Sequence, residues 1–296
     1  MTVDLPAVEE LPALRASARA WSEALRLPFR HKRWRGQAGE WAGMGVGSSL
    51  DFQDHRAYQP GDDPRQINWQ AYARTGHYTM KLYREEVRPL ADLVLDASDS
   101  MWAFEEKRSR AVELFYYAWE GALRAGAAAR VFAVKGEAVA PLAEEAVASG
   151  RWLEAVRALP PTAAHVMPAV GRVPFRGGSL RLLVSDLLFP GAPEGVIQPL
   201  AGQHGRGLVF APTSSEEARP GWEGNYEFVE AESGETNLRR INPELLARYT
   251  EAYRRHFELW KGCALRHGVA LARVPSEMDL GQALRAEAVA AGAVEV

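Results

Sequence analysis

The sequence predicts an α/β fold: a mostly parallel six-stranded sheet with helices on both faces, preceded by a helical and loop-rich N-terminal region. From residue 91 onward, short apolar runs alternate with helical patterns, an order that favours right-handed βαβ crossovers. Residues 43–69 differ from this alternating region, because they are rich in Gly, Asp, Arg and aromatic residues and show little clean periodicity. The 296 residues, 47% hydrophobic and 25% charged, have the composition of a globular protein with a substantial core.

The first 90 residues divide into two predicted parts. Residues 1–39 form a helical extension, since apolar residues between positions 7 and 27 fall mostly three or four apart. Residues 40–90 form tight loops around short strands. The glycines at positions 43, 45 and 47 are interpreted as turn residues, because no apolar strand precedes them and no Lys-Ser or Lys-Thr follows. The basic run at 31–35 is interpreted as a solvated surface.

Residues 91–296 form the predicted sheet domain. The Lys135-Gly136 step indicates a hairpin, so the third strand is expected to run antiparallel to the second. Pro243 follows Asn242 at the start of a long helix, where proline is favoured in the first turn. The predicted strands are 91–96, 129–134, 138–142, 180–187, 206–212 and 269–274, the predicted helices are 104–125, 143–158, 194–202, 242–267 and 278–291, and a small hairpin is expected at 226–236.

Charge and cysteine content exclude several classes of protein. The net charge of −3 offers no global attraction for nucleic acid. No stretch reaches the roughly 18 apolar residues of a transmembrane helix, so direct membrane insertion is not expected. The first ten residues lack the features of a secretory signal. Because Cys263 is the single cysteine, neither an intramolecular disulfide nor a cysteine-based zinc site can form, and we expect a reduced, cytoplasmic location.

A short loop of oxygen-bearing residues follows the first strand of the sheet. Asp96, Ser98 and Ser100 come directly after the apolar run 93–95. Carboxylate and hydroxyl oxygens suit a hard divalent cation such as Mg²⁺, which takes about six oxygen ligands. Ligands also bind outside the carboxyl ends of the strands in open α/β sheets. The alternative is that Ser98 and Ser100 only cap the next helix.

A second acidic loop is expected beside the first. Asp186 follows the fourth strand, as Asp96 follows the first. These two strands flank the point where the strand order reverses in a doubly wound sheet, so both carboxylates are expected to converge there. The alternative is that Asp186 only caps the loop into the following helix. The convergence favours a metal-compatible site over the capping interpretation.

A longer signature precedes the sheet. It runs from Asp51 to Trp69 and is followed by Ala73-Arg74 and Arg84-Glu85-Glu86. With this signature before an Asp-x-Ser-x-Ser strand, the chain resembles family fifty-eight of the domains of unknown function, and the resemblance spans residues 40 to 296. The signature residues that carry it are Asp51, His55, Arg56, Tyr58, Pro60, Gly61, Asp62, Asp63, Arg65, Asn68 and Trp69.

The resemblance implies a Rossmann-like fold of the von Willebrand factor A type, with a metal-ion-dependent adhesion site at the top of the sheet. It implies Asp96, Ser98, Ser100 and Asp186 as site residues, together with a Thr from an intervening loop. The chain departs from this pattern, because Ala164 stands at the expected Thr position with His165 beside it. Alanine cannot coordinate a cation, and Thr162 can replace the Thr only if the loop is reshaped. A weak site, a site completed by water and an empty site all remain open.

The role of the signature itself has two interpretations. A buried polar network is favoured over a binding surface, because packed loops dense in Asp and Arg must satisfy one another. The Asp62-Asp63 pair followed by Arg65 suits an ion-paired turn. No chemistry follows from these residues.

The sequence favours a non-enzymatic module that binds a protein partner through the top of the sheet with Mg²⁺. The resemblance implies that the metal accepts a partner's carboxylate, and that the partner is a MoxR-type AAA+ ATPase in a role akin to complex maturation. The alternative is a metal-dependent phosphoester hydrolase in which Asp96 and Asp186 hold a metal that activates water. The sequence shows neither a general base nor a second metal ligand set for that reaction, and it lacks the Asp-x-Asp of enzymes that form an aspartyl-phosphate.

Overall fold

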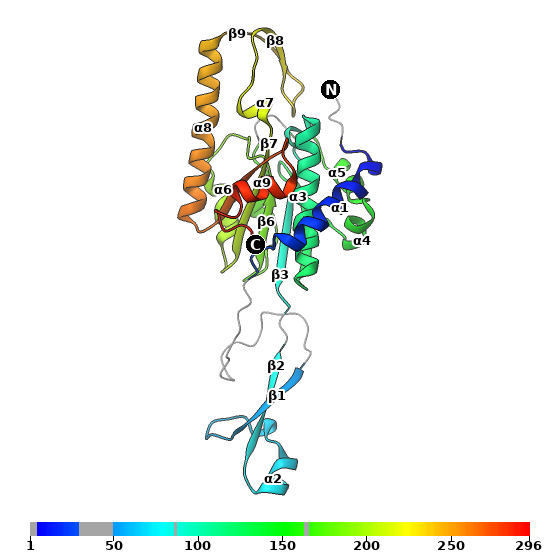
Figure 1. The fold of residues 1–296 in the computed structure, drawn as a ribbon, viewed down its shortest axis with the longest axis vertical. Helices are drawn as coiled ribbons and strands as arrows, with labels where there is room; N and C mark the ends of the chain where they lie inside the picture. The colour runs from blue at the N-terminus through cyan, green and yellow to red at the C-terminus, as the bar shows by residue number, and fades with distance from the viewer. Residues whose placement is uncertain (1–4, 30–49, 86–87, 163–165) are drawn as a thin grey trace. The chain divides into compact units, whose positions relative to one another are not determined.

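The computed structural model describes residues 5–29, 50–85, 88–162 and 166–296. The chain divides into two compact units. One joins the N-terminal segment up to Phe29 with Leu90–Val296, and the other is Arg30–Pro89. The first unit carries the predicted sheet, and Figure 1 labels its helices and several of its strands. Across the described ranges, no helix has both the length and the apolar character to cross a bilayer.

The first unit is built on a mixed six-stranded sheet in the order β10-β7-β6-β3-β4-β5. Five strands are parallel, and β5 pairs antiparallel with β4, as the Lys135-Gly136 step predicts. Strands β3 and β6 are neighbours, with Leu95 opposite Val184, so the two acidic loops do follow adjacent strands. All six predicted strands are confirmed: β3 (Leu90–Asp96), β4 (Ala128–Lys135), β5 (Ala138–Leu142), β6 (Leu180–Val184), β7 (Arg206–Thr213) and β10 (Ala270–Pro275).

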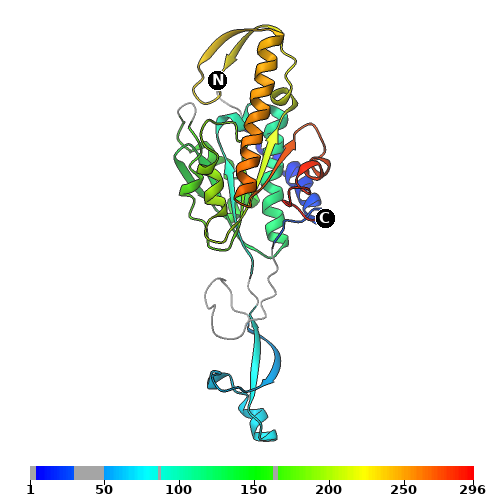
Figure 2. The same ribbon diagram turned by 90° about the vertical axis from the view of Figure 1, so that its left-hand side faces the viewer.

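Helices cover both faces of this sheet, as Figure 2 shows. Successive side chains of a strand point to opposite faces. Leu93 and Leu95 therefore pack into one core cluster with α1, α3 and α9, whereas Val94 packs into a second cluster with α6 and α8. Burial on both sides explains why β3 is a continuous apolar run. The helices are α1 (Leu11–Ala24), α3 (Glu105–Arg124), α4 (Glu144–Ser149), α5 (Trp152–Arg157), α6 (Glu194–Ala201), α7 (Ser215–Ala218), α8 (Pro243–Arg266) and α9 (Leu280–Glu287).

The N-terminal helix belongs to the sheet-bearing unit. A 3-10 turn at Val8–Glu10 leads into α1, which packs along α3. The buried hydroxyl of Tyr117 on α3 donates a hydrogen bond to the carbonyl of Leu25 at 2.7 Å. Arg15 on α1 forms an ion pair with Glu120 on α3, with 2.7 Å between Nε and Oε1. These contacts fix the helical extension against the covering layer of the sheet.

One predicted helix is divided in two. The pattern at 143–158 indicates a single helix, but α4 ends and α5 begins around Gly150. Gly150 has a φ of 79°, the left-handed conformation that commonly terminates helices. The prediction of one continuous helix is therefore wrong at this position.

Between α7 and α8, the chain forms the predicted small hairpin. Its strands are β8 (Gly224–Val229) and β9 (Thr236–Ile241), joined by a turn that contains Gly234 at a φ of 71°. Helix α8 starts directly after β9, where the Asn242 side chain accepts a hydrogen bond from the Leu245 amide at 2.8 Å. Figures 1 and 2 show the hairpin at the end of the unit where α8 begins.

The second unit is a two-stranded hairpin with helical turns between its strands. β1 (Leu50–Ala57) pairs antiparallel with β2 (Thr79–Glu85), and α2 (Trp69–Thr75) lies between them in sequence. Asn68 caps α2 by accepting a hydrogen bond from the Ala71 amide, and Gly76 ends the helix at a φ of 70°. The region has the tight loops and short strands that its Gly-, Asp- and Arg-rich sequence predicts. The glycines at 43, 45 and 47 and the basic run at 31–35 lie outside the described residues.

Candidate functional site

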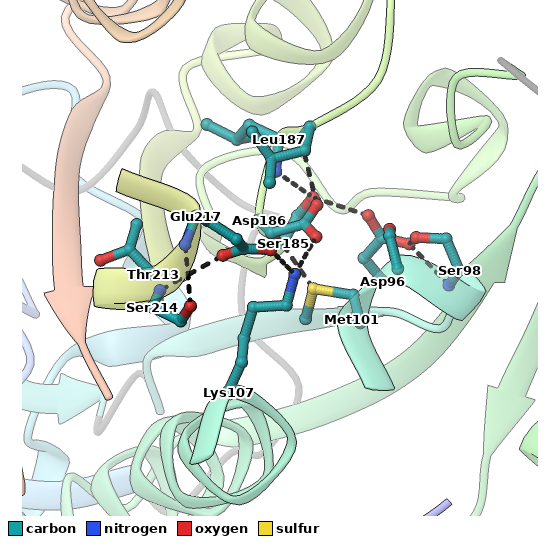
Figure 3. Close-up of polar contacts among 12 residues, drawn as sticks. Asp96, Ser98, Met101, Lys107, Ser185, Asp186, Leu187, Thr213, Ser214 and Glu217 are labelled. Carbon is teal, nitrogen blue, oxygen red and sulfur yellow. Dashed lines mark hydrogen bonds and ion pairs between the residues drawn. The ribbon is translucent and has the colours of Figure 1, made fainter. Parts of the chain in front are cut away.

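Asp96 is fully buried at the carboxyl end of β3, and its carboxylate connects the two predicted loops. Its Oδ1 accepts hydrogen bonds from the Ser98 amide at 3.0 Å and the Ser98 hydroxyl at 2.5 Å. Its Oδ2 accepts a hydrogen bond from the Ser185 hydroxyl at 2.6 Å, across the β3–β6 boundary. Figure 3 shows these contacts. The loop after β3 and the loop after β6 therefore converge, as the strand order predicts.

The environment of Asp96 is short of positive charge. Its hydrogen-bond donors within the described residues are neutral hydroxyl and amide groups. Burial, and then the nearby charge of Asp186, raise the pKa of Asp96 to about 6, although its hydrogen bonds act in the opposite direction. A cation beside this carboxylate would offset both effects.

Asp186 lies close to Asp96 but is held by a different partner. Its Oδ2 accepts a hydrogen bond from Lys107 Nζ at 2.9 Å, and its Oδ1 accepts one from the Leu188 amide at 3.1 Å. The hydrogen bond from the Leu188 amide closes a local turn, which agrees with the alternative interpretation that Asp186 caps the loop after β6. The contact with Lys107 is an ion pair between two side chains that are each 1% exposed. One charge of the predicted site is thus already paired within the protein.

Lys107 also forms an ion pair with Glu217, so one ammonium group bridges two buried carboxylates. Burial would lower the pKa of Lys107, but the charges of Asp186 and Glu217 outweigh it and raise this pKa above its ordinary value. For Glu217, burial is the largest effect, and its pKa lies above the usual range. Lys107 is therefore an internal cation whose charge is shared between Asp186 and Glu217.

The sequence interpretation missed Lys107 and Glu217, although both leave a signal. Lys107 shares a helix face with the apolar Ala111 and Leu114, four and seven positions later, which marks it as a buried charge. Ser214 and Glu217 form a capping box at the start of α7, in which each side chain accepts a hydrogen bond from the other's backbone amide. A Ser-x-x-Glu after an apolar strand is recognisable as this motif.

The two serines of the loop take different roles. Ser98 precedes a 3-10 turn at Asp99–Trp102 but makes no side-chain cap to it, because its hydroxyl is donated to Asp96. Ser100 lies within that turn, and its amide donates a hydrogen bond to Glu232 Oε1 at 3.3 Å. For Ser98, the structure therefore contradicts the capping alternative and favours a role at Asp96.

The loop after β6 carries backbone strain. Leu187 is fully buried and has a φ of 59°, a left-handed conformation that costs an aliphatic residue on the order of 1–3 kcal/mol. Its amide donates to the Ser185 hydroxyl at 3.2 Å, and its carbonyl lies 2.7 Å from His256 Nε2. Strain of this kind concentrates at functional sites.

Thr162 follows α5 in sequence, and its side chain packs against Gly136 in the turn between β4 and β5. A side-chain carbon added at Gly136 would come within 2.6 Å of Thr162 Cγ2, so Thr162 packs directly on this turn. Because β4 runs parallel to β3, the turn is at the same edge of the sheet as Asp96. Ala164 and His165 lie outside the described residues, so the assignment of the expected Thr position to Ala164 stays a prediction.

The donor set fits a hard cation in type. Asp96, Ser98 and Ser100 belong to one loop and offer carboxylate and hydroxyl oxygens, which Mg²⁺ prefers. The described ranges contain no group of three or more His, Cys, Asp or Glu side chains arranged to hold a metal, so a cation here would depend on the serine hydroxyls. The observation that supports a cation here is that Asp96 is buried and accepts hydrogen bonds only from neutral groups among the described residues.

The signature residues are partly a polar network and partly exposed. Arg56 pairs with Asp62 through two hydrogen bonds of 2.7 and 2.6 Å. Asp63 accepts a hydrogen bond from the Arg65 amide at 2.9 Å, so it caps a turn rather than pairing with the arginine side chain. Trp69 is 57% exposed and is not part of a buried network.

Other signature positions shape the backbone of this unit. Gly61 has a φ of 107° in the turn after β1, next to Pro60. Tyr58 contacts Tyr78, the residue before β2, with 6.2 Å between ring centroids. The side chains of Asp51 and His55 lie outside the described residues.

Residues 54–258 match the family described as "Protein of unknown function DUF58". The chain belongs to this family. The match begins within β1 and ends within α8, so it is narrower than the 40–296 expected from the sequence, but it includes Asp96 and the residues around it. No curated protein matches the chain.

Two solved structures are similar to the DUF58 chain at low identity. A conserved hypothetical protein, BatB, from Bacteroides thetaiotaomicron is 16% identical, with 69% of this chain and 98% of that chain covered and a TM-score of 0.33. An aerotolerance-related membrane protein from Bacteroides fragilis is 12% identical, with the same coverage and a TM-score of 0.33. At this TM-score, neither likeness bears on the function of the chain.

Proposed function

We propose that this DUF58 protein is a non-enzymatic protein-interaction module with a fold of the von Willebrand factor A type. Its partner binds at the carboxyl edge of the sheet, through a Mg²⁺ ion at a metal-ion-dependent adhesion site. The observation that carries the proposal is the buried carboxylate of Asp96, held between the hydroxyls of Ser98 and Ser185.

The loop residues Asp96, Ser98 and Ser100 would hold the cation. A cation with few charged ligands stays electrophilic and attracts an external anion such as a partner's carboxylate. Lys107 supports this arrangement, because its single positive charge is shared between Asp186 and Glu217, whereas the hydrogen-bond donors to Asp96 among the described residues are all neutral. Thr162 lies at the same edge but would need the loop that follows it to bring its hydroxyl to the cation.

The partner class is a further part of the proposal. A MoxR-type AAA+ ATPase in a cytoplasmic, chaperone-like maturation process is supported by the resemblance of the Asp51–Trp69 signature. A phosphoester hydrolase is the second candidate, and it requires a base that activates water. The contacts favour neither Asp96 nor Lys107 as that base, because Asp96 accepts three hydrogen bonds and Lys107 is shared between two carboxylates.

Calorimetric titration of the full chain with Mg²⁺ tests the cation site. Wild type is expected to bind one ion, Asp96→Ala to bind none, and Asp99→Ala to bind as wild type does, because Asp99 is in the same loop but pairs with Lys135. Absence of binding to wild type would sink the metal-dependent proposal. A pull-down of the ATPase tests the role of the cation in partner binding. Capture by Asp96→Ala, or capture by wild type in EDTA, would show that the partner binds without the cation.

Phosphatase activity provides a test between the two candidates. Wild type is expected to show no turnover of p-nitrophenyl phosphate with Mg²⁺ present. Turnover that disappears in Asp96→Ala would favour the hydrolase.

A further inference from the structure

The tip of the β8–β9 hairpin contacts the Asp96 loop directly. Glu232, between β8 and β9, accepts the hydrogen bond from the Ser100 amide at 3.3 Å. The two residues are 132 positions apart in sequence, so the contact is a tertiary one between the hairpin and the candidate cation loop. It brings an additional carboxylate to the edge of the sheet where a partner's carboxylate is proposed to bind.

The hairpin tip is held in a defined conformation by its own contacts. Glu230 Oε2 accepts a hydrogen bond from the Ser233 amide at 2.6 Å, and the Ser233 hydroxyl accepts one from the Glu235 amide at 3.1 Å. The backbone closes the turn through the Gly234 amide, which donates to the Glu230 carbonyl at 2.9 Å. Glu232 is therefore presented from a closed turn.

Glu232 lies among other carboxylates at this edge of the sheet. Glu232 is half-buried, and the carboxylates of Glu230 and Asp186 both lie close enough to act on it. Lys107 does not relieve this crowding directly, since its ammonium is already bound between Asp186 and Glu217. A divalent cation at Asp96, Ser98 and Ser100 would attract the Glu232 carboxylate and turn repulsion into attraction.

We propose that Glu232 is the chain's own occupant of the position meant for the partner's carboxylate. With Mg²⁺ bound, the hairpin tip closes over the cation, and a partner must displace Glu232 before its own carboxylate reaches the metal. The inference rests on the proposed cation site and adds its regulation. An internal occupant lowers the apparent affinity for the partner by the fraction of molecules in which the site is closed.

The test compares wild type with Glu232→Gln in the full chain. Glu235→Gln is the matched control, because Glu235 is exposed in the same turn and contributes its backbone amide to the turn. Mg²⁺ affinity is measured by calorimetry, and amide hydrogen exchange is measured across residues 224–241 with Mg²⁺ and with EDTA. Mg²⁺ is expected to protect the hairpin tip in wild type and in Glu235→Gln. In Glu232→Gln, that protection should disappear and Mg²⁺ should bind about tenfold more weakly.

The outcomes separate this inference from the cation site itself. Equal Mg²⁺ affinity and equal protection in wild type and Glu232→Gln, with binding lost in Asp96→Ala, would overturn the role of the hairpin and keep the cation site. Binding that survives Asp96→Ala but disappears in Glu232→Gln would place the ion on the hairpin and overturn both. No binding to wild type would also overturn both.

Discussion

At the scale of single residues, Lys107 decides the electrostatics of the site. Its ammonium bridges Asp186 and Glu217 at positions where all three side chains are largely buried. Removal of one partner from a buried charge group leaves the others uncompensated, which costs far more than the group contributes as a whole. Lys107 is thus the residue on which the paired state of Asp186 depends.

Lys107→Met is expected to lower the free energy of unfolding by about 3–5 kcal/mol, because two buried carboxylates lose their counter-ion. Lys261→Met is the control, since Lys261 pairs with Glu287 while 41% of its side chain is exposed, and its loss should cost about 1 kcal/mol or less. Urea unfolding measures both. Addition of Glu217→Gln should recover part of the loss. Equal effects of the two lysine substitutions would show that Asp186 and Glu217 do not need Lys107.

At the scale of elements, α1 and α9 meet at a close contact. A side-chain carbon at Gly281, in the first turn of α9, would lie 2.4 Å from the ring of Trp21 on α1. The absence of a side chain there lets the aromatic ring lie on the start of α9. The N-terminal helix is therefore matched in shape to the last helix of the chain.

Two glycine substitutions are expected to act in opposite directions. Gly281→Ala should lower the free energy of unfolding by about 1–3 kcal/mol, because the new methyl group displaces Trp21. Gly262→Ala in α8 should raise it by about 0.5–1 kcal/mol, since its nearest neighbour is Arg266 Nη1 at 3.9 Å and alanine favours the helix. Thermal and urea unfolding measure both changes. A stabilised Gly281→Ala would contradict the close packing of α1 on α9.

The elements also show what periodicity predicts well. Six strands follow from apolar runs because burial on both faces requires them, and β3 is buried at every position after its first. The single predicted helix at 143–158 fails because the left-handed Gly150 ends α4 without breaking the apolar pattern. Hydrophobic period marks which face is buried, whereas helix ends depend on local backbone conformation.

At the scale of the whole molecule, a second polar network holds the opposite end of β3. Asp92 is fully buried and accepts hydrogen bonds from Arg130 Nε at 3.0 Å, Arg176 Nε at 2.8 Å and the Ser179 hydroxyl at 2.8 Å. The hydrogen bonds of Asp92 therefore connect β3 with β4 and with the segment before β6. Burial by itself would raise the pKa of Asp92, but the hydrogen bonds from Arg130 and Arg176 outweigh it and hold the pKa below its ordinary value.

This network predicts a pH dependence of global stability. Because the folded-state pKa of Asp92 is lower than the unfolded value, its contribution is present at neutral pH and is lost as the pH falls below about 4. Asp92→Asn should therefore unfold more easily than wild type at pH 7, and the difference should narrow between pH 5 and 3. Urea unfolding across this range measures it. A difference that stays constant with pH would exclude the ionised Asp92 as its cause.

The sequence by itself determined which segments form the six strands, the antiparallel edge at β5 and the convergence of Asp96 with the loop of Asp186, because each follows from a local pattern and from the topology of a doubly wound sheet. Only the tertiary structure decided the partners of those groups. Lys107 reaches Asp186 over 79 positions and Glu217 over 110, and Ser100 reaches Glu232 over 132. Contacts of this kind depend on how helix α3 packs on the sheet and on where the tip of the β8–β9 hairpin lies, and no local pattern of residues specifies that geometry.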